Sequence, residues 1–285
     1  MTIDGIIKQA QELSKKNWIH AMHILQNAED QHPDEPRLQT TIADLFITKM
    51  HYQSALKHYL RALAYEPDNP LLIQAIASCY LAQREYRLAL VYYLRIKNPS
   101  EDILYNIGYT QALLGKNRDS IATMQKLLTR LPNHPFVYYV IIEQYYELGE
   151  TDEALRYLRQ ARQYCGENMQ LSLFGGLLFS AKGMHMQAYY SYSQAASSGK
   201  IKNPDHMIRF ASSALNTGLP LEAIRILQDA EGQWPYLSEI YVNQMRTYLY
   251  LGDVQKAKEV LMRARKNVSR HSPTLRLMEE RLKEL

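Results

Sequence analysis

Small and large apolar residues recur along this chain with a period close to 34 residues. One small residue marks each copy of the pattern. These residues are Ala21, Ala55, Ala89, Ser120, Ala154, Ala188, Ala223 and Ala257, with spacings of 34, 34, 31, 34, 34, 35 and 34. A large residue follows four positions later, and a third apolar residue, most often alanine, follows three positions after that. Because positions i, i+4 and i+7 share one helical face, the pattern predicts a buried small–large–small stripe in every copy.

A second apolar stripe lies upstream of the first in each copy, for example at Tyr138, Ile141 and Tyr145. The two stripes are separated by a glycine in five copies, at Gly115, Gly149, Gly183, Gly218 and Gly252. Glycine is favoured just after a helix, where the backbone adopts a positive φ. Each copy is therefore expected to form two antiparallel helices of roughly 12–15 residues, the mean helix in globular proteins being of similar length.

One such hairpin cannot bury both stripes alone, and stacking of successive hairpins solves the problem by forming a solenoid. The predicted repeats cover 1–35, 36–69, 70–100, 101–134, 135–168, 169–203, 204–237 and 238–271. Residues 272–285 remain, with Ser272 suited to cap a helix and Pro273 to its first position. Because Leu275, Met278, Leu282 and Leu285 share one face of that helix, we expect it to cover the last repeat. The sequence thus predicts an all-α chain of about seventeen helices and no sheet.

The order of residues within a copy resembles the tetratricopeptide repeat. The second copy carries the resemblance at Ile42, Ala43, Phe46, Ala55, Tyr59, Ala62 and Pro67, and the fifth at Tyr138, Ile141, Tyr145, Gly149, Ala154, Leu158 and Ala161. The resemblance implies a right-handed superhelical solenoid of antiparallel helix pairs, in which the first helix of each pair lines a concave groove. It also implies a non-enzymatic protein that binds other proteins.

Two copies depart from the repeat. The third ends early, at Asn98-Pro99, and the sixth carries Gly175-Gly176 where one glycine is usual. A glycine inside a helix costs about 1 kcal/mol relative to alanine. We interpret both departures as sites of local change in curvature, with a functional hinge as the alternative.

No catalytic motif is found. The chain contains no HExxH, GxxxxGK[ST], GxSxG or GxGxxG sequence. His20 and His23 can share a helical face but have no third metal ligand nearby, and Cys79 and Cys165 fall in repeats that are not neighbours. We therefore predict no enzyme activity, no cofactor and no metal site.

The compartment is predicted from features that are missing. The N-terminus has no apolar core after a basic start, which a signal peptide would require. No window approaches the roughly 20 apolar residues of a membrane span. With only two cysteines among its residues, the chain is expected to be a reduced, cytoplasmic protein.

Charge is uneven in one segment. The chain carries 33 Lys and Arg against 29 Asp and Glu, a net charge of +4. Residues 256–270 contain six basic residues and one acid, so this segment alone carries +5. Since a nucleic-acid groove needs basic residues along its whole length, we favour a solvated helix face here, with nucleic acid or another acidic partner as the alternative.

Aromatic residues mark the candidate binding surface. The chain holds 22 tyrosines, many of them at core positions such as Tyr145. The resemblance places six other aromatics on the groove side of the first helices of repeats four to six: Tyr105, Tyr109, Phe136, Tyr139, Tyr146 and Phe174. Tyrosine is favoured at interfaces because it combines a large apolar face with a hydroxyl group. The alternative is that these rings pack only on one another.

The partner is not a chaperone tail. The tetratricopeptide clamp for such tails uses Lys, Asn, Asn, Lys and Arg on three successive first helices, and here Asn106 and Asn243 lack the basic partners. We therefore predict a scaffold that binds a peptide segment or a partner protein in its groove. The alternatives are a self-assembling homo-oligomer and, less favoured, a nucleic-acid-binding helical-repeat protein.

Overall fold

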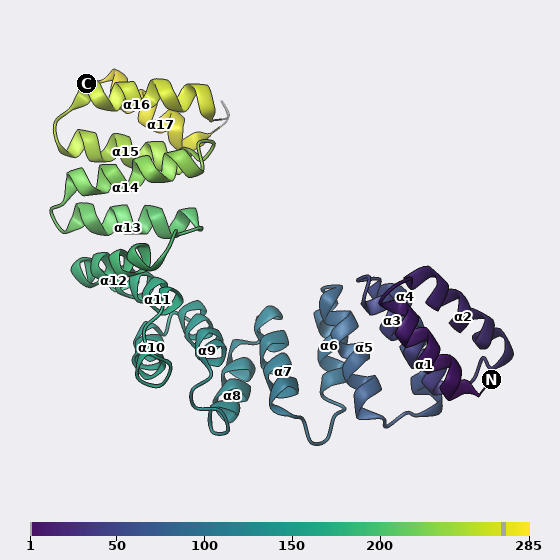
Figure 1. The fold of residues 1–285 in the computed structure, drawn as a ribbon. Helices are drawn as coiled ribbons and strands as arrows, with labels where there is room; N and C mark the ends of the chain where they lie inside the picture. The colour runs from purple at the N-terminus through teal and green to yellow at the C-terminus, as the bar shows by residue number, and fades with distance from the viewer. Residues whose placement is uncertain (1, 269–271) are drawn as a thin grey trace. The chain divides into compact units, whose positions relative to one another are not determined.

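The computed structural model describes residues 2–268 and 272–285 and contains only α-helices within them (Figure 1). Seventeen helices are present there, as the sequence pattern predicts. They divide into two compact units, Met1–Pro132 and Asn133–Leu285. The first unit contains α1 (Ile3–Ser14), α2 (Trp18–Gln31), α3 (Pro36–Ile47), α4 (Tyr52–Tyr65), α5 (Pro70–Ala82), α6 (Tyr86–Tyr93), α7 (Glu101–Leu113) and α8 (Asn117–Leu128).

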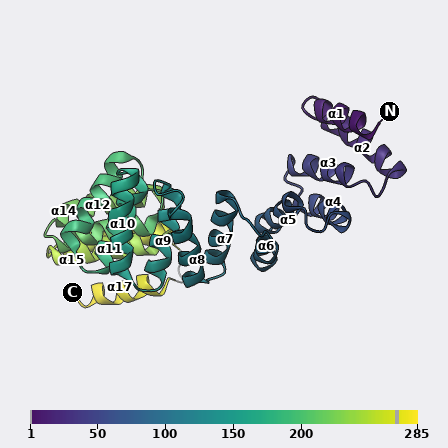
Figure 2. The same ribbon diagram turned by 90° about the horizontal axis from the view of Figure 1, so that it is seen from below.

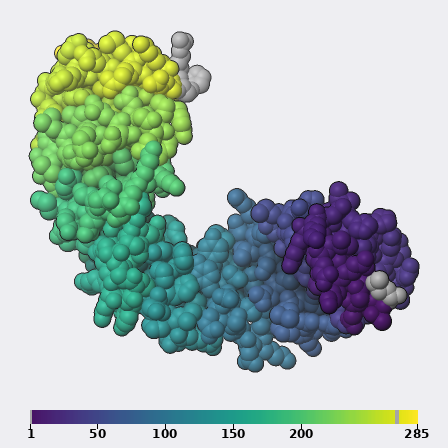
Figure 3. All heavy atoms as spheres, viewed as in Figure 1, coloured from purple at the N-terminus to yellow at the C-terminus, as the bar shows by residue number. Residues whose placement is uncertain are grey.

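The second unit holds the remaining nine described helices. They are α9 (Pro135–Glu147), α10 (Thr151–Cys165), α11 (Met169–Ala181), α12 (His185–Ser198), α13 (Pro204–Asn216), α14 (Pro220–Gln233), α15 (Ser238–Tyr250), α16 (Val254–Asn267) and α17 (Pro273–Lys283). In Figure 1, α13, α14, α15 and α16 lie in successive layers, and Figure 2 gives the view from below. In the space-filling view of Figure 3, the atoms of these layers form a continuous surface.

Helix starts follow local chemistry. The side chains of Asn17, Ser100 and Asn168 each accept a hydrogen bond from a backbone N–H in the first turn of the helix that follows. Proline occupies the first turn of α3, α5, α9, α13, α14 and α17. The missing N–H of proline costs nothing there, and its fixed φ suits a helix.

The small–large–small stripe forms the core. All eight small residues that define the period, from Ala21 to Ala257, have an exposed fraction of 0%. The large residues that follow them are also buried, from Leu25 at 0% to Leu261 at 7%. The second helix of each pair therefore lies against its neighbours along this stripe, as the sequence predicts.

Serine replaces alanine in the fourth copy without leaving a buried polar group unpaired. The Ser120 hydroxyl donates a 2.7 Å hydrogen bond to the carbonyl of Gly108 on α7. A Cβ atom at Gly108 would lie 2.9 Å from Cε of Met124. The pair α7–α8 is thus built on a small residue on each helix and one buried hydrogen bond.

Packing is between near neighbours in the chain. Extensive contacts join helices one or two places apart, such as α3 with α4 and α4 with α5. First helices also contact one another directly, in the pairs α1–α3, α9–α11, α11–α13 and α13–α15. Because the first helices of successive pairs touch, side chains between them are shielded from solvent.

The turn between the two helices of a pair requires a left-handed residue. Gly115, Gly149, Gly183, Gly218 and Gly252 have φ between +68° and +81°, as expected for helix-ending glycines. Repeats two and three have no glycine there, and Met50 (φ +57°) and Arg84 (φ +62°) adopt the same conformation. This conformation costs a non-glycine residue about 1–2 kcal/mol.

The two departures from the repeat have local explanations. The third copy has a short second helix, because α6 spans 8 residues and ends at Tyr93. Helix α11 continues through Gly175 and Gly176. A Cβ atom at Gly176 would lie 2.5 Å from the ring of Tyr192, and one at Gly175 would lie 3.0 Å from the hydroxyl oxygen of Ser191. The glycine pair therefore admits α12 at close range.

The end helix covers the last pair. Leu275, Met278 and Leu282 of α17 are 2–6% exposed and join one cluster with Leu261 and Ala264 of α16. The prediction was wrong for Leu285, which lies beyond the end of the helix and is 63% exposed. Ser272 caps the helix by accepting a bond from the Leu275 N–H. Helix α17 contacts α15 as well as α16, which is the placement that the first helix of a further repeat would take.

We expect glycine at the two strained turns to stabilise the fold. Met50 and Arg84 are exposed, so Met50→Gly and Arg84→Gly remove backbone strain without removing core packing. Each substitution should raise the free energy of unfolding by about 0.5–1 kcal/mol. The control Gly115→Ala, which meets no atom within 4 Å, should lower it by a similar amount. Urea unfolding measures the stability of all three variants. A loss of stability in both Met50→Gly and Arg84→Gly would show that the backbone at these two turns is not strained.

We expect Gly176→Ala to destabilise the α11–α12 pair by about 1–3 kcal/mol, because the fully buried Tyr192 ring must move away from the added methyl group. Gly232→Ala is the control, since that helical glycine has open space around its Cβ position. It should be neutral or slightly stabilising. Equal thermal unfolding of both variants would show that the close approach is not required.

Removal of residues 272–285 should expose the apolar side of α16, lower solubility and abolish hydrogen-exchange protection first in α15 and α16. A finer test uses two neighbouring residues of α17. Met278→Ala, at 3% exposure, should cost about 2 kcal/mol, whereas Leu277→Ala, at 65%, should cost little. Wild-type solubility and protection after the deletion would rule out a covering role.

Candidate functional site

Two of the six candidate aromatics lie on α7 in the first unit. The rings of Tyr105 and Tyr109 are stacked, with centroids 6.1 Å apart and planes 6° from parallel. Tyr109 is 39% exposed, whereas Tyr105 is half-buried. Burial, and then the neighbouring Tyr109, raise the pKa of the Tyr105 hydroxyl. The pair therefore presents one stacked aromatic surface, with its more exposed ring at Tyr109.

Three more candidates form a cluster across α9 and α11 in the second unit. Phe136 contacts Tyr139 edge to face, with centroids 5.6 Å apart and planes at 80°. Tyr139 in turn contacts Phe174 at 5.8 Å. Phe136 is 58% exposed, while Tyr139 and Phe174 are half-buried. The cluster thus joins two successive first helices and has Phe136 as its open end.

Tyr139 is held in place by the start of α11. Its hydroxyl donates a 3.1 Å hydrogen bond to Oδ1 of Asn168, and the same oxygen accepts a 3.1 Å bond from the Leu171 N–H. Burial raises the pKa of the Tyr139 hydroxyl, and the bond to Asn168 partly offsets the rise. The ring is therefore fixed by the residue that caps α11.

The sixth candidate, Tyr146, and its neighbour Tyr145 lie in different environments. Tyr146 is half-buried, whereas Tyr145 is 7% exposed and stacks on Tyr157 at 5.5 Å. Tyr145 is thus part of the core, as its stripe position predicts.

A carboxylate lies on the same helix as the second-unit cluster. Glu143 is exposed and stands one helical turn after Tyr139, and Glu147 follows one turn later. Surrounding protein raises the pKa of the Glu143 carboxyl, and the like charge of Glu147 raises it further. A cationic group brought close to Glu143 would stabilise its charged form and lower its pKa again.

Two other positions that the tetratricopeptide resemblance assigns to the groove side are buried. They are Leu173 on α11 and Val242 on α15, which are 9% and 4% exposed. Leu173 packs with Met207 and Phe210 of α13. The reason is the direct contact between successive first helices, which buries the position nearest the neighbouring helix. The same position holds Tyr139 on α9, which contacts α11, and this explains why Tyr139 is half-buried.

Comparison with known proteins identifies the fold of this chain. A tetratricopeptide-repeat family model matches residues 102–134, which span α7 and α8. A tetratricopeptide repeat protein from Parabacteroides merdae has 17% identity and a TM-score of 0.62, covering 87% of this chain and 97% of that one. The chain has the tetratricopeptide-repeat fold.

Two further solved structures are similar to this chain. The C-terminal part of a repeat protein from Cytophaga hutchinsonii matches at 15% identity and a TM-score of 0.67, over 83% of this chain and 98% of that one. The Cut9–Hcn1 hetero-tetramer of the APC/C matches at 13% identity and a TM-score of 0.59, over 99% of this chain and 56% of that one. The sequence has no match among curated proteins.

The two asparagines at clamp-like positions of the tetratricopeptide array are engaged within the fold. Burial raises the pKa of the Tyr93 hydroxyl, and hydrogen bonds with Ser78 and Asn106 partly offset the rise. Asn243 donates a 2.7 Å bond to the Glu239 carbonyl. Both asparagines thus make hydrogen bonds within the array itself.

In the part of the chain that the structure describes, three of the six basic residues in the segment of the eighth repeat form ion pairs. Arg263 bonds Glu231 at 3.0 Å, Arg265 pairs with Glu279 of α17, and Lys256 lies 3.0 Å from Asp253. Arg270 lies outside the described residues. These ion pairs support the solvated-face interpretation, because acids within the chain neutralise part of the segment's charge.

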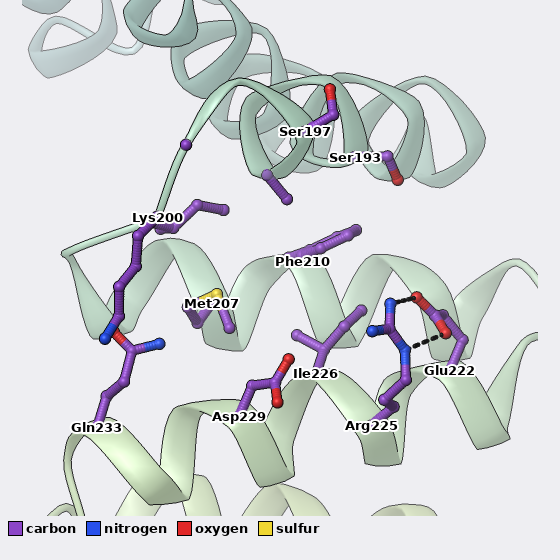
Figure 4. Close-up of a pocket in the computed structure, with 13 residues that line it drawn as sticks. Ser193, Ser197, Lys200, Met207, Phe210, Glu222, Arg225, Ile226, Asp229 and Gln233 are labelled. Carbon is purple, nitrogen blue, oxygen red and sulfur yellow. Dashed lines mark hydrogen bonds and ion pairs between the residues drawn. The ribbon is translucent and has the colours of Figure 1, made fainter.

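Sequence reasoning missed a pocket on the second-helix side of the second unit. It has a volume of about 640 Å³ and lies between α12, α13 and α14. Figure 4 shows Met207, Phe210 and Ile226 in its middle, with Lys200, Asp229 and the Arg225–Glu222 ion pair around them. The available signal was the run of small residues at the end of α12, including Ala196, Ser197 and Gly199.

An ion pair lies on the wall of this pocket. Arg225 donates to both carboxylate oxygens of Glu222, at 2.6 and 2.8 Å, which lowers the pKa of Glu222. Among the described residues, no group of three or more His, Cys, Asp or Glu side chains is arranged to hold a metal ion. None of the described helices is both long and apolar enough to span a membrane.

Proposed function

We propose that this protein is a non-enzymatic scaffold that binds a peptide segment or a partner protein through its first-helix aromatics, Tyr105, Tyr109, Phe136, Tyr139, Tyr146 and Phe174. The observation that carries the proposal is the cluster of Phe136, Tyr139 and Phe174 across α9 and α11. Solvent contact of a large ring is unfavourable, and Phe136 remains 58% exposed on this cluster. Rigid aromatic clusters of this kind commonly anchor interfaces.

The ligand chemistry follows from the neighbours of the cluster. Apolar ligand side chains fit against Phe136 and Phe174, and a lysine or arginine fits beside Glu143. The fixed Tyr139 ring lowers the ordering cost of binding, because its hydroxyl is already bonded to Asn168. The structural similarity to a chain of the hetero-tetramer Cut9-Hcn1 supports the proposal.

Substitution of the exposed ring tests the proposal. Phe136→Ala should weaken partner binding about thirtyfold, the equivalent of about 2 kcal/mol, because truncation of an aromatic anchor typically costs that much. It should leave the melting temperature nearly unchanged, since the side chain is mostly exposed. The full chain serves as bait in its native cell lysate, and quantitative mass spectrometry compares the captured proteins with those of wild type.

Two control variants separate loss of binding from loss of an exposed ring elsewhere and from loss of stability. Tyr190→Ala removes a ring of similar exposure, 64%, from the second-helix side, and it should keep the same partners. Tyr145→Ala removes a core ring and should destabilise the fold by about 3–5 kcal/mol. Identical capture by Phe136→Ala and wild type, with a large loss of stability, would reject the groove assignment.

A further inference from the structure

Helix α6 is apolar on more than one side, unlike the other second helices of the array. Its eight residues, YRLALVYY, include one charged side chain, Arg87. Ala89 and Tyr93 face the core at 0% exposure. Leu88, Val91 and Leu94 are 43%, 58% and 61% exposed. A helix that is apolar all round normally has a partner on each side, and the outer side of α6 has none among the described residues.

The outer side of α6 has the spacing of a helix-docking surface. Arg87, Leu90, Val91 and Leu94 occupy positions i, i+3, i+4 and i+7 and therefore form one stripe. These four residues, together with Leu114 and Lys116 from the turn between α7 and α8, line a groove of about 360 Å³. The whole groove lies within the first unit.

The charge on the groove has one sign. Arg87 and Lys116 are its two charged residues, and among the described residues neither has an acidic partner. Arg95, at the end of the same helix, is already engaged with the Tyr92 ring and the Pro67 carbonyl. The acidic residues nearest in sequence, Glu85 and Asp119, do not line the groove. An apolar stripe between two unpaired cations is complementary to an apolar stripe flanked by carboxylates.

We propose that the groove of α6 binds an acidic amphipathic helix of a partner protein, at a site separate from the first-helix aromatics. The apolar side of that helix packs on the exposed Val91 and Leu94, above the buried Leu90, and its flanking Glu or Asp residues pair with Arg87 and Lys116. A second copy of this chain fits less well, because a two-fold contact through this groove brings the cations of one copy against those of the other.

The probe is a synthetic helical peptide with leucine at heptad positions a and d and glutamate at positions e and g, compared with a twin in which lysine replaces glutamate. Fluorescence anisotropy measures binding of each peptide to the full chain. The acidic peptide should bind at least about tenfold more tightly than its twin, and added salt should reduce the difference. The double variant Arg87→Glu/Lys116→Glu should reverse the preference.

Exposed positions keep the test independent of folding. Val91→Ser and Leu94→Ser should weaken binding of the acidic peptide about tenfold or more, because both side chains lie in the groove. Met262→Ser is the matched control: Met262 is 54% exposed on α16 among basic residues but lines no groove described here. It should bind the peptide as wild type does.

Three outcomes would overturn the proposal. They are failure of the acidic peptide to bind, equal binding of both peptides, and binding unchanged by the Arg87 and Lys116 reversal. Light scattering supplies a fourth: a dimer that Leu94→Ser dissociates would assign the groove to a second copy of the chain. None of these results depends on Phe136, so the two proposals stand or fail separately.

Discussion

The fold depends on close approach between helices at one small residue in each repeat. Each of the eight residues from Ala21 to Ala257 is fully buried, and a larger side chain there would push the second helix away from its partner. Ser120 meets the requirement only because its hydroxyl bonds the Gly108 carbonyl. Large side chains fill the space between the closely packed helices, as the Tyr192 ring does beside Gly176.

Much of the fold could be predicted from the sequence because the same pattern of small and large apolar residues recurs in each repeat. Local patterns of residue size and polarity define the period, the stripes, the turn glycines and the end helix. Such patterns can be recognised because a helix places its side chains at a fixed angular spacing. What the sequence could not show were residues that break the pattern while keeping the structure. Met50 and Arg84 adopt the glycine conformation, and no local signal distinguishes them from ordinary turn residues.

The candidate site was harder to predict than the fold. The six aromatics could be selected by position, but their exposure depends on contacts between first helices of different repeats, which no local pattern encodes. Leu173 and Val242 therefore looked like groove residues and are buried. The bond from Tyr139 to Asn168 joins residues 29 apart in sequence and is equally invisible without the structure. The pocket beside Phe210 needs three helices to form it.

Packing between near neighbours has a consequence for how the molecule responds to a bound ligand. Each helix pair shares its free energy mainly with the pairs beside it, so the molecule behaves as a row of coupled segments rather than as one cooperative body. Within the second unit, energy gained at α9 and α11 reaches α15 only through the intervening helices and diminishes at each step. Mutations in repeats that do not touch should consequently add in their effects, and separate stretches of the chain can evolve separate affinities.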